Sequence, residues 1–223
     1  MVSPADQGGP FKVLLVGAGQ IGSRHLQALA RSRLNLSIEI LEPIACAGDK
    51  AVRRFHEVSI SEGIKELRII DSLDSSSFRG YADVAIIATG AGPRRDAIEN
   101  LLDRIKVPFL ILEKVLFQRL SDIDDVETLL ARNGCKAWVN CARRLFPYSR
   151  DLKQLFSGDV LSISAQGGNW GLACNGIHLF DLLAFLSGVS IPDGWNTGFL
   201  DNAMYDAQRS GYRGITPGGD RQL

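Results

Sequence analysis

The sequence predicts an α/β protein, with an N-terminal doubly wound parallel sheet and a shortened α+β domain after it. Up to about residue 140, short apolar runs alternate with segments of helical periodicity, the pattern of a parallel sheet covered on both faces. Three glycines, Gly17, Gly19 and Gly22, separate the first apolar run from the first helical segment. We place the domain boundary near residue 120, which gives domains 1–120 and 121–223.

Continuous apolar runs supply the strands of the first domain. They are rich in Val, Ile and Leu and lack the polar alternation of a half-exposed strand, so both sheet faces should be buried. The predicted strands are residues 11–16, 37–41, 66–70, 83–88, 108–112 and 136–140.

Helical segments follow most of these strands. Ser121 is a candidate N-cap, and Asp122, Asp124 and Asp125 in the following turn suit the positive end of a helix dipole. The predicted helices are residues 21–32, about 49–56, 94–104 and 121–132.

The pattern changes after the sixth strand. A helix at 148–156 precedes an alternating run at 160–165, which predicts a half-exposed antiparallel strand. A helix at 175–186 is apolar on nearly all sides, which predicts burial, and Gly188 should end it. The last part of the chain holds only short strand-like pieces such as 202–207.

Composition excludes several classes of function. The 25 basic residues balance 25 acidic ones, so neither nucleic acid nor an anionic membrane is an expected partner. The 4 cysteines lack zinc-ligand spacing and there are only 3 histidines, which argues against a metal site and for reduced thiols. The polar start MVSPADQGGP is unlike a signal peptide, and no apolar run approaches the ~20 residues that span a bilayer. We therefore expect a soluble cytoplasmic protein.

The glycines have the context of a dinucleotide-binding fingerprint, because they follow a predicted strand and open a predicted helix. Gly17 would allow a tight turn, Gly19 close approach of a pyrophosphate, and Gly22 close packing of helix on strand. Glu42 ends the second strand, where an acid accepts hydrogen bonds from the adenosine ribose. No Arg follows it at once to receive a 2′-phosphate, which favours NAD(H) over NADP(H) as the cofactor.

Two other interpretations of the loop stay open. The turn could be an empty Rossmann turn, or it could belong to a methyltransferase, which usually wants a glycine at the position of Ile21. The remaining candidates for cofactor contact are Gln20, Ile21, Thr89 and Glu113.

Two further places carry candidate chemistry. Lys114 ends the fifth strand, at the edge where parallel sheets bind ligands, and could stabilise negative charge on a substrate oxygen. The alternative is a solvated charge pair with Glu113. His178 opens the apolar helix and could accept a hydroxyl proton, with Asp181 on the same face to orient it. The alternative is a hydrogen-bonded core histidine.

In this order, GAGQIGSRH, LEK and GIHLFDLLAFLSG resemble the Gfo/Idh/MocA oxidoreductases over about Phe11 to Tyr212. The resemblance implies a nicotinamide cofactor and the oxidation or reduction of sugars, inositols or sugar nucleotides. It also implies that His25 opens the first helix, that Lys114 contacts the reacting hydroxyl, and that His178 serves as acid or base.

The chain departs from the family pattern in three ways. Val115 replaces the proline of the EKP motif, often a cis-peptide site in the family. Cys174 replaces the leading Asp of DxGxHxxD, so a proton relay must use Asp181, Asn175 or water. Family chains are usually longer, and we expect this one to be truncated or altered by a frameshift near Thr216.

These observations predict hydride transfer between NAD and a carbinol carbon of a sugar or sugar nucleotide, with Lys114, His178 and Asp181 as catalytic residues. A dinucleotide-binding protein without turnover, either a sensor or a remnant, is the alternative. Too few strands follow Gly188 to complete the family's second sheet, so a homodimer with an apolar two-fold interface is expected to cover the apolar helix. Otherwise the tail from residue 196 folds back over it or stays disordered.

Overall fold

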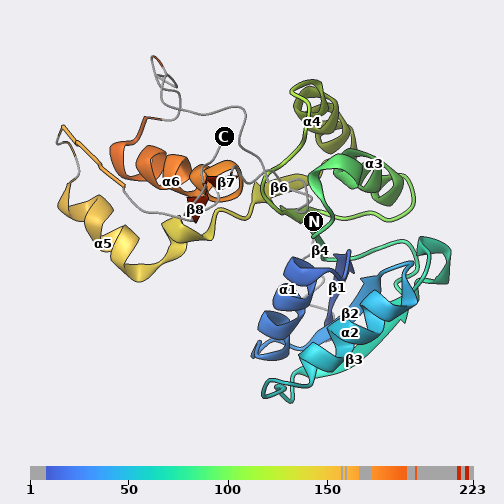
Figure 1. The fold of residues 1–223 in the computed structure, drawn as a ribbon. Coiled ribbons are helices and arrows are strands. Elements are labelled where there is room, and N and C mark those ends of the chain that lie inside the picture. The colour runs from blue at the N-terminus through green and yellow to red at the C-terminus, as the bar shows by residue number, and fades with distance from the viewer. Residues whose placement is uncertain are drawn as a thin grey trace. The chain divides into compact units, whose positions relative to one another are not determined.

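The computed structural model describes residues 9–156, 158, 160–165, 172–189, 194, 215–216 and 219–220. The chain divides into two compact units, one that ends at Asn140 and one that begins at Cys141 (Figure 1). The first unit extends beyond the predicted boundary at residue 120, because the last strand before Asn140 belongs to its sheet. In the parts of the chain described, no helix has the length and apolar character needed to cross a membrane.

A six-stranded sheet forms the centre of the first unit, with strand order β3-β2-β1-β4-β5-β6. Every neighbouring pair is parallel, which confirms the predicted doubly wound architecture. The chain order reverses between β1 and β4, and the carboxyl ends of the strands at such a switch point form the usual ligand site. The strands are β1 (Phe11–Val16), β2 (Leu36–Leu41), β3 (Ile64–Ile70), β4 (Val84–Ile87), β5 (Phe109–Leu112) and β6 (Lys136–Val139).

Helices cover the two faces of this sheet in pairs. The side chains of Val13 and Leu15 on β1 pack in one core cluster with residues of α1 and α2. Their neighbours Leu14 and Val16 point to the other face, where residues of α3 and α4 bury them. In Figure 1, α1 and α2 lie together beside β1–β3, and α3 lies next to α4. These helices are α1 (Gln20–Ala30), α2 (Ala45–Phe55), α3 (Ala91–Leu102) and α4 (Ser121–Asn133), and a short 3₁₀ helix, η2 (Leu73–Ser75), precedes β4.

Two helix starts differ from the prediction. Helix α2 begins at Ala45 rather than near residue 49. Gly48 lies within its first turns and faces Ile69 of β3. A Cβ at Gly48 would stand 3.2 Å from the Ile69 side chain, so a glycine there serves packing and does not break the helix. The prediction of Ser121 as an N-cap is wrong. Leu120 takes the cap position in a helical conformation, and no side chain caps α4.

The described residues of the second unit form helices and a pair of short strands. The carboxylate of Asp181 on α6 accepts hydrogen bonds from Arg144 of η3, and the Lys153 ammonium of α5 lies 5.3 Å from the centre of the Phe185 ring. Helix α6 ends before Gly188, whose φ of +78° suits a glycine, as predicted. The elements are η3 (Ala142–Leu145), α5 (Pro147–Leu155), α6 (Leu172–Ser187), β7 (Ile215–Thr216) and β8 (Gly219–Asp220), the last two antiparallel.

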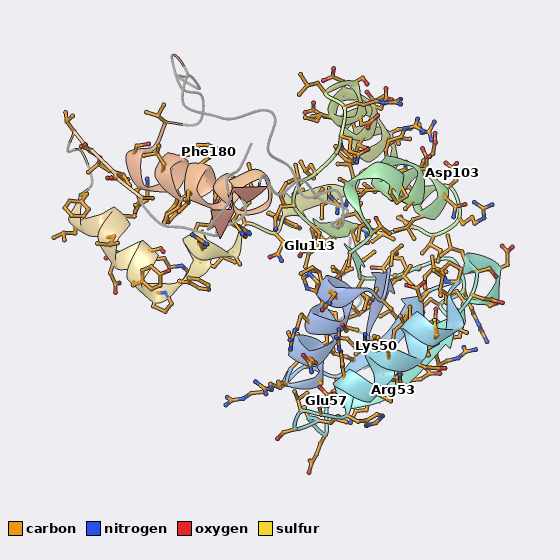
Figure 2. All side chains as sticks on the ribbon, in the orientation of Figure 1. Lys50, Arg53, Glu57, Asp103, Glu113 and Phe180 are labelled. Carbon is orange, nitrogen blue, oxygen red and sulfur yellow. The ribbon has the colours of Figure 1, made fainter. Side chains whose placement is uncertain are left out.

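Two predictions for this unit are wrong. Residues 160–165 form no strand, and within the described residues they have no strand beside them to complete a ladder, so alternation alone did not suffice. Helix α6 is not buried on all sides, because Phe180 and Leu183 are 45% and 42% exposed (Phe180 is labelled in Figure 2). The predicted strand-like piece at 202–207 lies outside the described residues.

Candidate functional site

The glycine loop adopts the geometry that its sequence predicts. Gly17 has a φ of +92°, and its N–H donates to the carbonyl of Leu41, 3.0 Å away, so the chain turns directly at the end of β1. A Cβ at Gly22 would lie 2.0 Å from the Gly17 carbonyl oxygen, so α1 packs against the loop at a distance that only glycine permits. A Cβ at Gly19 would meet no atom within 4 Å. The loop is therefore closed on the protein side and open at Gly19.

Glu42 at the end of β2 is joined to this loop. One carboxylate oxygen accepts from the Ala18 N–H at 2.8 Å, and the other accepts from the Ile44 N–H at 3.1 Å. The residue is only 9% exposed. Because each carboxylate oxygen can accept more than one hydrogen bond, both keep capacity for hydroxyl groups of a ligand. The predicted ribose acceptor thus lies beside the loop predicted to bind pyrophosphate.

Thr89 lies beside the loop at the end of β4. A Cβ at Gly17 would stand 3.1 Å from its amide nitrogen. The Thr89 hydroxyl is buried and has no hydrogen-bond partner in the part of the chain that the structure describes. Buried polar atoms almost always find a partner, so this hydroxyl fits a polar group supplied by a ligand. Together with Gly19 and Glu42 it makes the residues present compatible with a dinucleotide. The other predicted contacts, Gln20 and Ile21, are exposed in the first turn of α1.

Glu113 at the end of β5 is a buried carboxylate that joins three elements (labelled in Figure 2). One of its oxygens lies 2.7 Å from Nε2 of His25 on α1 and accepts from the amide of Asn140, after β6, at 2.6 Å. Burial alone would raise the pKa of Glu113, but the hydrogen bonds from His25 and Asn140 hold it below its ordinary value. The alternative of a solvated Glu113 paired with Lys114 is therefore wrong.

Lys114 follows at the carboxyl edge of the sheet and is half-buried. The peptide bond between Lys114 and Val115 is cis, at the place where the EKP motif carries its proline. Lys114 thus stands in a loop whose preceding residue is fixed to α1 and to the end of β6.

Arg94 in the first turns of α3 belongs to the same loop and was not predicted. It is 2% exposed, and its guanidinium donates to the carbonyls of Glu113, Val115 and Leu116 at 2.5, 2.5 and 2.7 Å, and also to that of Thr89. Burial lowers the pKa of Arg94 to about 10, although the Glu113 charge opposes the shift, so the group stays charged at neutral pH.

A signal for this burial was present in the sequence. Arg94 stands four and seven residues before Ile98 and Leu101, both buried, so helical spacing puts it on the inner face of α3. The neighbouring Arg95 lies on the outer side and pairs with Glu99 at 2.7 Å.

The other predicted catalytic residues lie in the second unit. His178 is half-buried on α6. The Asp181 carboxylate, predicted to orient His178, is instead bound through both oxygens by Arg144, with 2.9 Å from Nε to one of them. The side chain of Cys174 lies outside the described residues.

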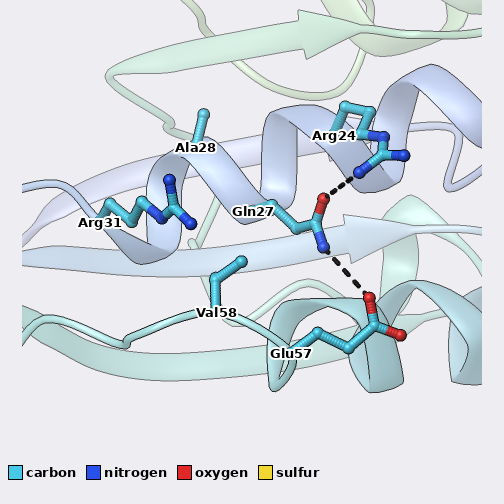
Figure 3. Close-up of a pocket in the computed structure, with 6 residues that line it drawn as sticks. All are labelled: Arg24, Gln27, Ala28, Arg31, Glu57 and Val58. Atoms are coloured by element: carbon cyan, nitrogen blue, oxygen red, sulfur yellow. Dashed lines mark hydrogen bonds between the residues drawn. The ribbon is translucent and has the colours of Figure 1, made fainter.

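A polar pocket opens between α1 and the segment that follows α2 (Figure 3). Gln27 joins its two sides, because it donates to Glu57 at 3.4 Å, and it also accepts from Arg24 of its own helix at 2.9 Å. The residues drawn there are Arg24, Gln27, Ala28, Arg31, Glu57 and Val58, and none of them is a predicted site residue.

Solved structures with the same fold include three dehydrogenases or oxidoreductases. Scyllo-inositol dehydrogenase from Lactobacillus casei, with NAD(H) and scyllo-inositol bound, has a TM-score of 0.59 at 20% identity, over 80% of this chain and 56% of that one. A putative NADPH-dependent oxidoreductase from Desulfitobacterium hafniense has a TM-score of 0.60 at 17% identity, over 81% and 55%. The WlbA dehydrogenase from Thermus thermophilus, in complex with NAD and alpha-ketoglutarate, has a TM-score of 0.56 at 22% identity, over 79% and 62%.

At these identities the similarity establishes a common fold. This chain spans just over half the length of the first of these structures. A search of curated proteins gave no match. The model of the Gfo/Idh/MocA oxidoreductases, described as having an NAD-binding Rossmann fold, matches residues 11–141, more than half of the chain. The chain belongs to this NAD-binding oxidoreductase family.

Proposed function

We propose that this chain transfers hydride between NAD(H) and a carbinol carbon of a sugar or sugar nucleotide. One observation carries the proposal. The glycine loop, Glu42, Thr89 and Lys114 follow β1, β2, β4 and β5, so all four lie at the carboxyl edge of neighbouring parallel strands. That edge is where a doubly wound sheet binds its ligand. Fold neighbours crystallised with inositols support a polyhydroxylated substrate.

The Glu42 carboxylate supports NAD(H) rather than NADP(H). It already accepts two backbone N–H groups and is nearly buried, so its oxygens are held in place beside the loop. Ribose hydroxyls donate to such a carboxylate, whereas a 2′-phosphate would meet it as a like charge.

The glycine loop, Glu42 and Thr89 would hold NAD, which would supply the acceptor for a hydride from the substrate carbon. The Lys114 ammonium donates a hydrogen bond to the substrate hydroxyl oxygen and stabilises the negative charge that grows on it. The His178 imidazole takes the hydroxyl proton as the carbon–hydrogen electron pair leaves, so the carbinol becomes a carbonyl. In the reverse direction His178 returns that proton to the oxygen.

A second candidate is a dinucleotide-binding protein without turnover. The contact that favours it is the pairing of Asp181 with Arg144, because it occupies the carboxylate that sequence reasoning assigned to His178. A carboxylate already bound by a guanidinium stabilises a protonated imidazole less than a carboxylate without that cation.

Cofactor titration followed by a substrate panel separates these functions. We expect NADH to bind more tightly than NADPH, measured by nicotinamide fluorescence, and a sugar or sugar nucleotide to reduce NAD. Lys114→Ala should lower kcat/KM by about 100-fold or more, while the Kd for NADH stays within about 3-fold. Lys50→Ala is the control, because this lysine is exposed and lies on α2, far from Lys114 in the sequence (labelled in Figure 2).

Tight NADH binding with no turnover on any substrate would favour the binding protein. If NADPH bound more tightly, the role given to Glu42 would be wrong. If Lys114→Ala or His178→Ala kept full turnover, the catalytic assignments would be wrong.

A further inference from the structure

Arg94 is a buried guanidinium whose hydrogen bonds go to backbone carbonyls. Three of those carbonyls belong to Glu113, Val115 and Leu116 after β5, and one belongs to Thr89 after β4. Residues 113–118 form neither helix nor strand, so these carbonyls have no ladder partners of their own. Arg94 supplies the donors that this stretch of backbone requires.

The position of these contacts along the chain matters more than their number. Two of the bonded carbonyls belong to Glu113 and Val115, the residues on either side of Lys114. The same guanidinium contacts Thr89, whose amide nitrogen lies 3.1 Å from where a Cβ of Gly17 would be. One side chain therefore fixes the backbone on both sides of Lys114 to the loop next to the dinucleotide turn.

Among the described residues, Arg94 makes no direct ion pair, since the Glu113 group that it contacts is the carbonyl and not the carboxylate. That carboxylate is bound by His25 and Asn140 instead. Burying a charged group costs free energy unless hydrogen bonds compensate for the lost water, and here backbone carbonyls supply those bonds. A planar guanidinium holds several acceptors in one fixed arrangement, which a lysine ammonium cannot reproduce.

We propose that Arg94 is a positioning residue, which sets the place of Lys114 relative to the bound nicotinamide. The proposal rests on the proposed hydride transfer, in which Lys114 contacts the reacting hydroxyl. Displacement of a reacting group by about 1 Å lowers rates by about 100-fold. Loss of the Arg94 contacts should therefore slow hydride transfer without weakening the binding of the adenosine end of the cofactor.

Arg94→Lys tests this, with Arg95→Ala as the matched control on the outer side of the same helix. We expect Arg94→Lys to lower the single-turnover hydride-transfer rate by about 30-fold or more, with the Kd for NADH within about 3-fold of wild type. Arg95→Ala should leave both unchanged. Should Arg94→Lys fail to fold, Arg94→Gln takes its place in the same measurements.

A double mutant separates positioning from a general loss of structure. If Arg94 acts through Lys114, Arg94→Lys should lower the rate of Lys114→Ala by less than about 3-fold, because the group that it positions is already absent. Full additivity of the two losses, or a wild-type rate in Arg94→Lys, would overturn the proposal.

Failure of the proposed function gives a different result. If the wild-type protein transfers no hydride, hydrogen exchange of NADH-saturated protein decides the matter. Faster exchange of residues 115–118 in Arg94→Lys, with β5 still protected, would support a positioning role, and unchanged exchange would overturn it.

Discussion

Replacement of Gly22 by alanine is the sharpest test of the glycine loop. The new Cβ would lie 2.0 Å from the Gly17 carbonyl oxygen, against a closest real approach of 3.0 Å, so helix and loop must separate by about 1 Å. The Gly17 carbonyl belongs to the backbone and the new Cβ is bonded directly to the backbone of α1, so no flexible side chain can yield. Overpacking of this kind costs about 1–3 kcal/mol. Alanine returns up to about 1 kcal/mol because it is the better helix former.

We therefore expect Gly22→Ala to lose about 1–2 kcal/mol of unfolding free energy, which lowers Tm by about 2–8 °C. The Gly17 turn moves with the loop, so the Kd for NADH should rise by about 10-fold or more. Thermal melting followed by circular dichroism measures the first effect, and fluorescence titration with NADH measures the second.

Gly19→Ala is the matched control, because its Cβ would meet nothing within 4 Å and the φ of −62° suits alanine. The free energy of unfolding should stay within about 0.5 kcal/mol of wild type. Alanine is a poorer N-cap residue than glycine, but it also makes the unfolded chain less flexible, and the two effects are of similar size. NADH affinity should nevertheless fall by about 10-fold, because the methyl group occupies the open side of the loop. Unchanged melting of Gly22→Ala, or unchanged NADH affinity of Gly19→Ala, would refute this account of the loop.

Three further predictions concern other residues. Glu42→Ala should weaken NADH binding about 10-fold and narrow its advantage over NADPH in the same titration, because the ribose loses a charged acceptor. Glu113→Gln should destabilise the protein at pH 7 by about 1–3 kcal/mol, because the low pKa of this carboxyl makes its ionised form a source of stability. That difference should be fully present above pH ~4.5 and disappear as pH falls through the lower folded-state pKa, as denaturant titrations at several pH values would show. Light scattering should find a homodimer, and replacing the exposed Phe180 and Leu183 with Asp should give a folded monomer of 24.3 kDa. A wild-type monomer would contradict the last prediction.

The first unit was predictable because its signals are local and repeated. The inner strands β1, β4 and β5 are mostly apolar runs, and the roles of Gly17 and Gly22 follow from where a strand meets a helix. Glu42 was found because a fixed number of residues separates the glycine loop from the end of β2.

The failures have tertiary causes. Ser121 suits an N-cap, but Leu120 already has helical torsion angles, so the backbone and not the side chain determines where α4 starts. Alternation in residues 160–165 cannot reveal whether a neighbouring strand exists. In the sequence Arg94 looks like one of two surface arginines, unless its spacing to the buried residues of α3 is counted. Its carbonyl partners could not be predicted, because they come from other parts of the chain.

The bond between the Ala18 N–H and Glu42 makes cofactor preference hard to evolve or to engineer in isolation. A change at position 42 to a side chain without an oxygen at this place would admit a phosphorylated ribose, but it would also remove the acceptor for the Ala18 N–H of the glycine loop. No substitution at Ala18 can compensate, because its contribution is a main-chain donor. Glutamine at position 42 is the mildest route, since it removes the negative charge and keeps one carbonyl oxygen for Ala18. Lineages that exchange one cofactor for the other should therefore pass through glutamine, or rebuild the loop at the same time.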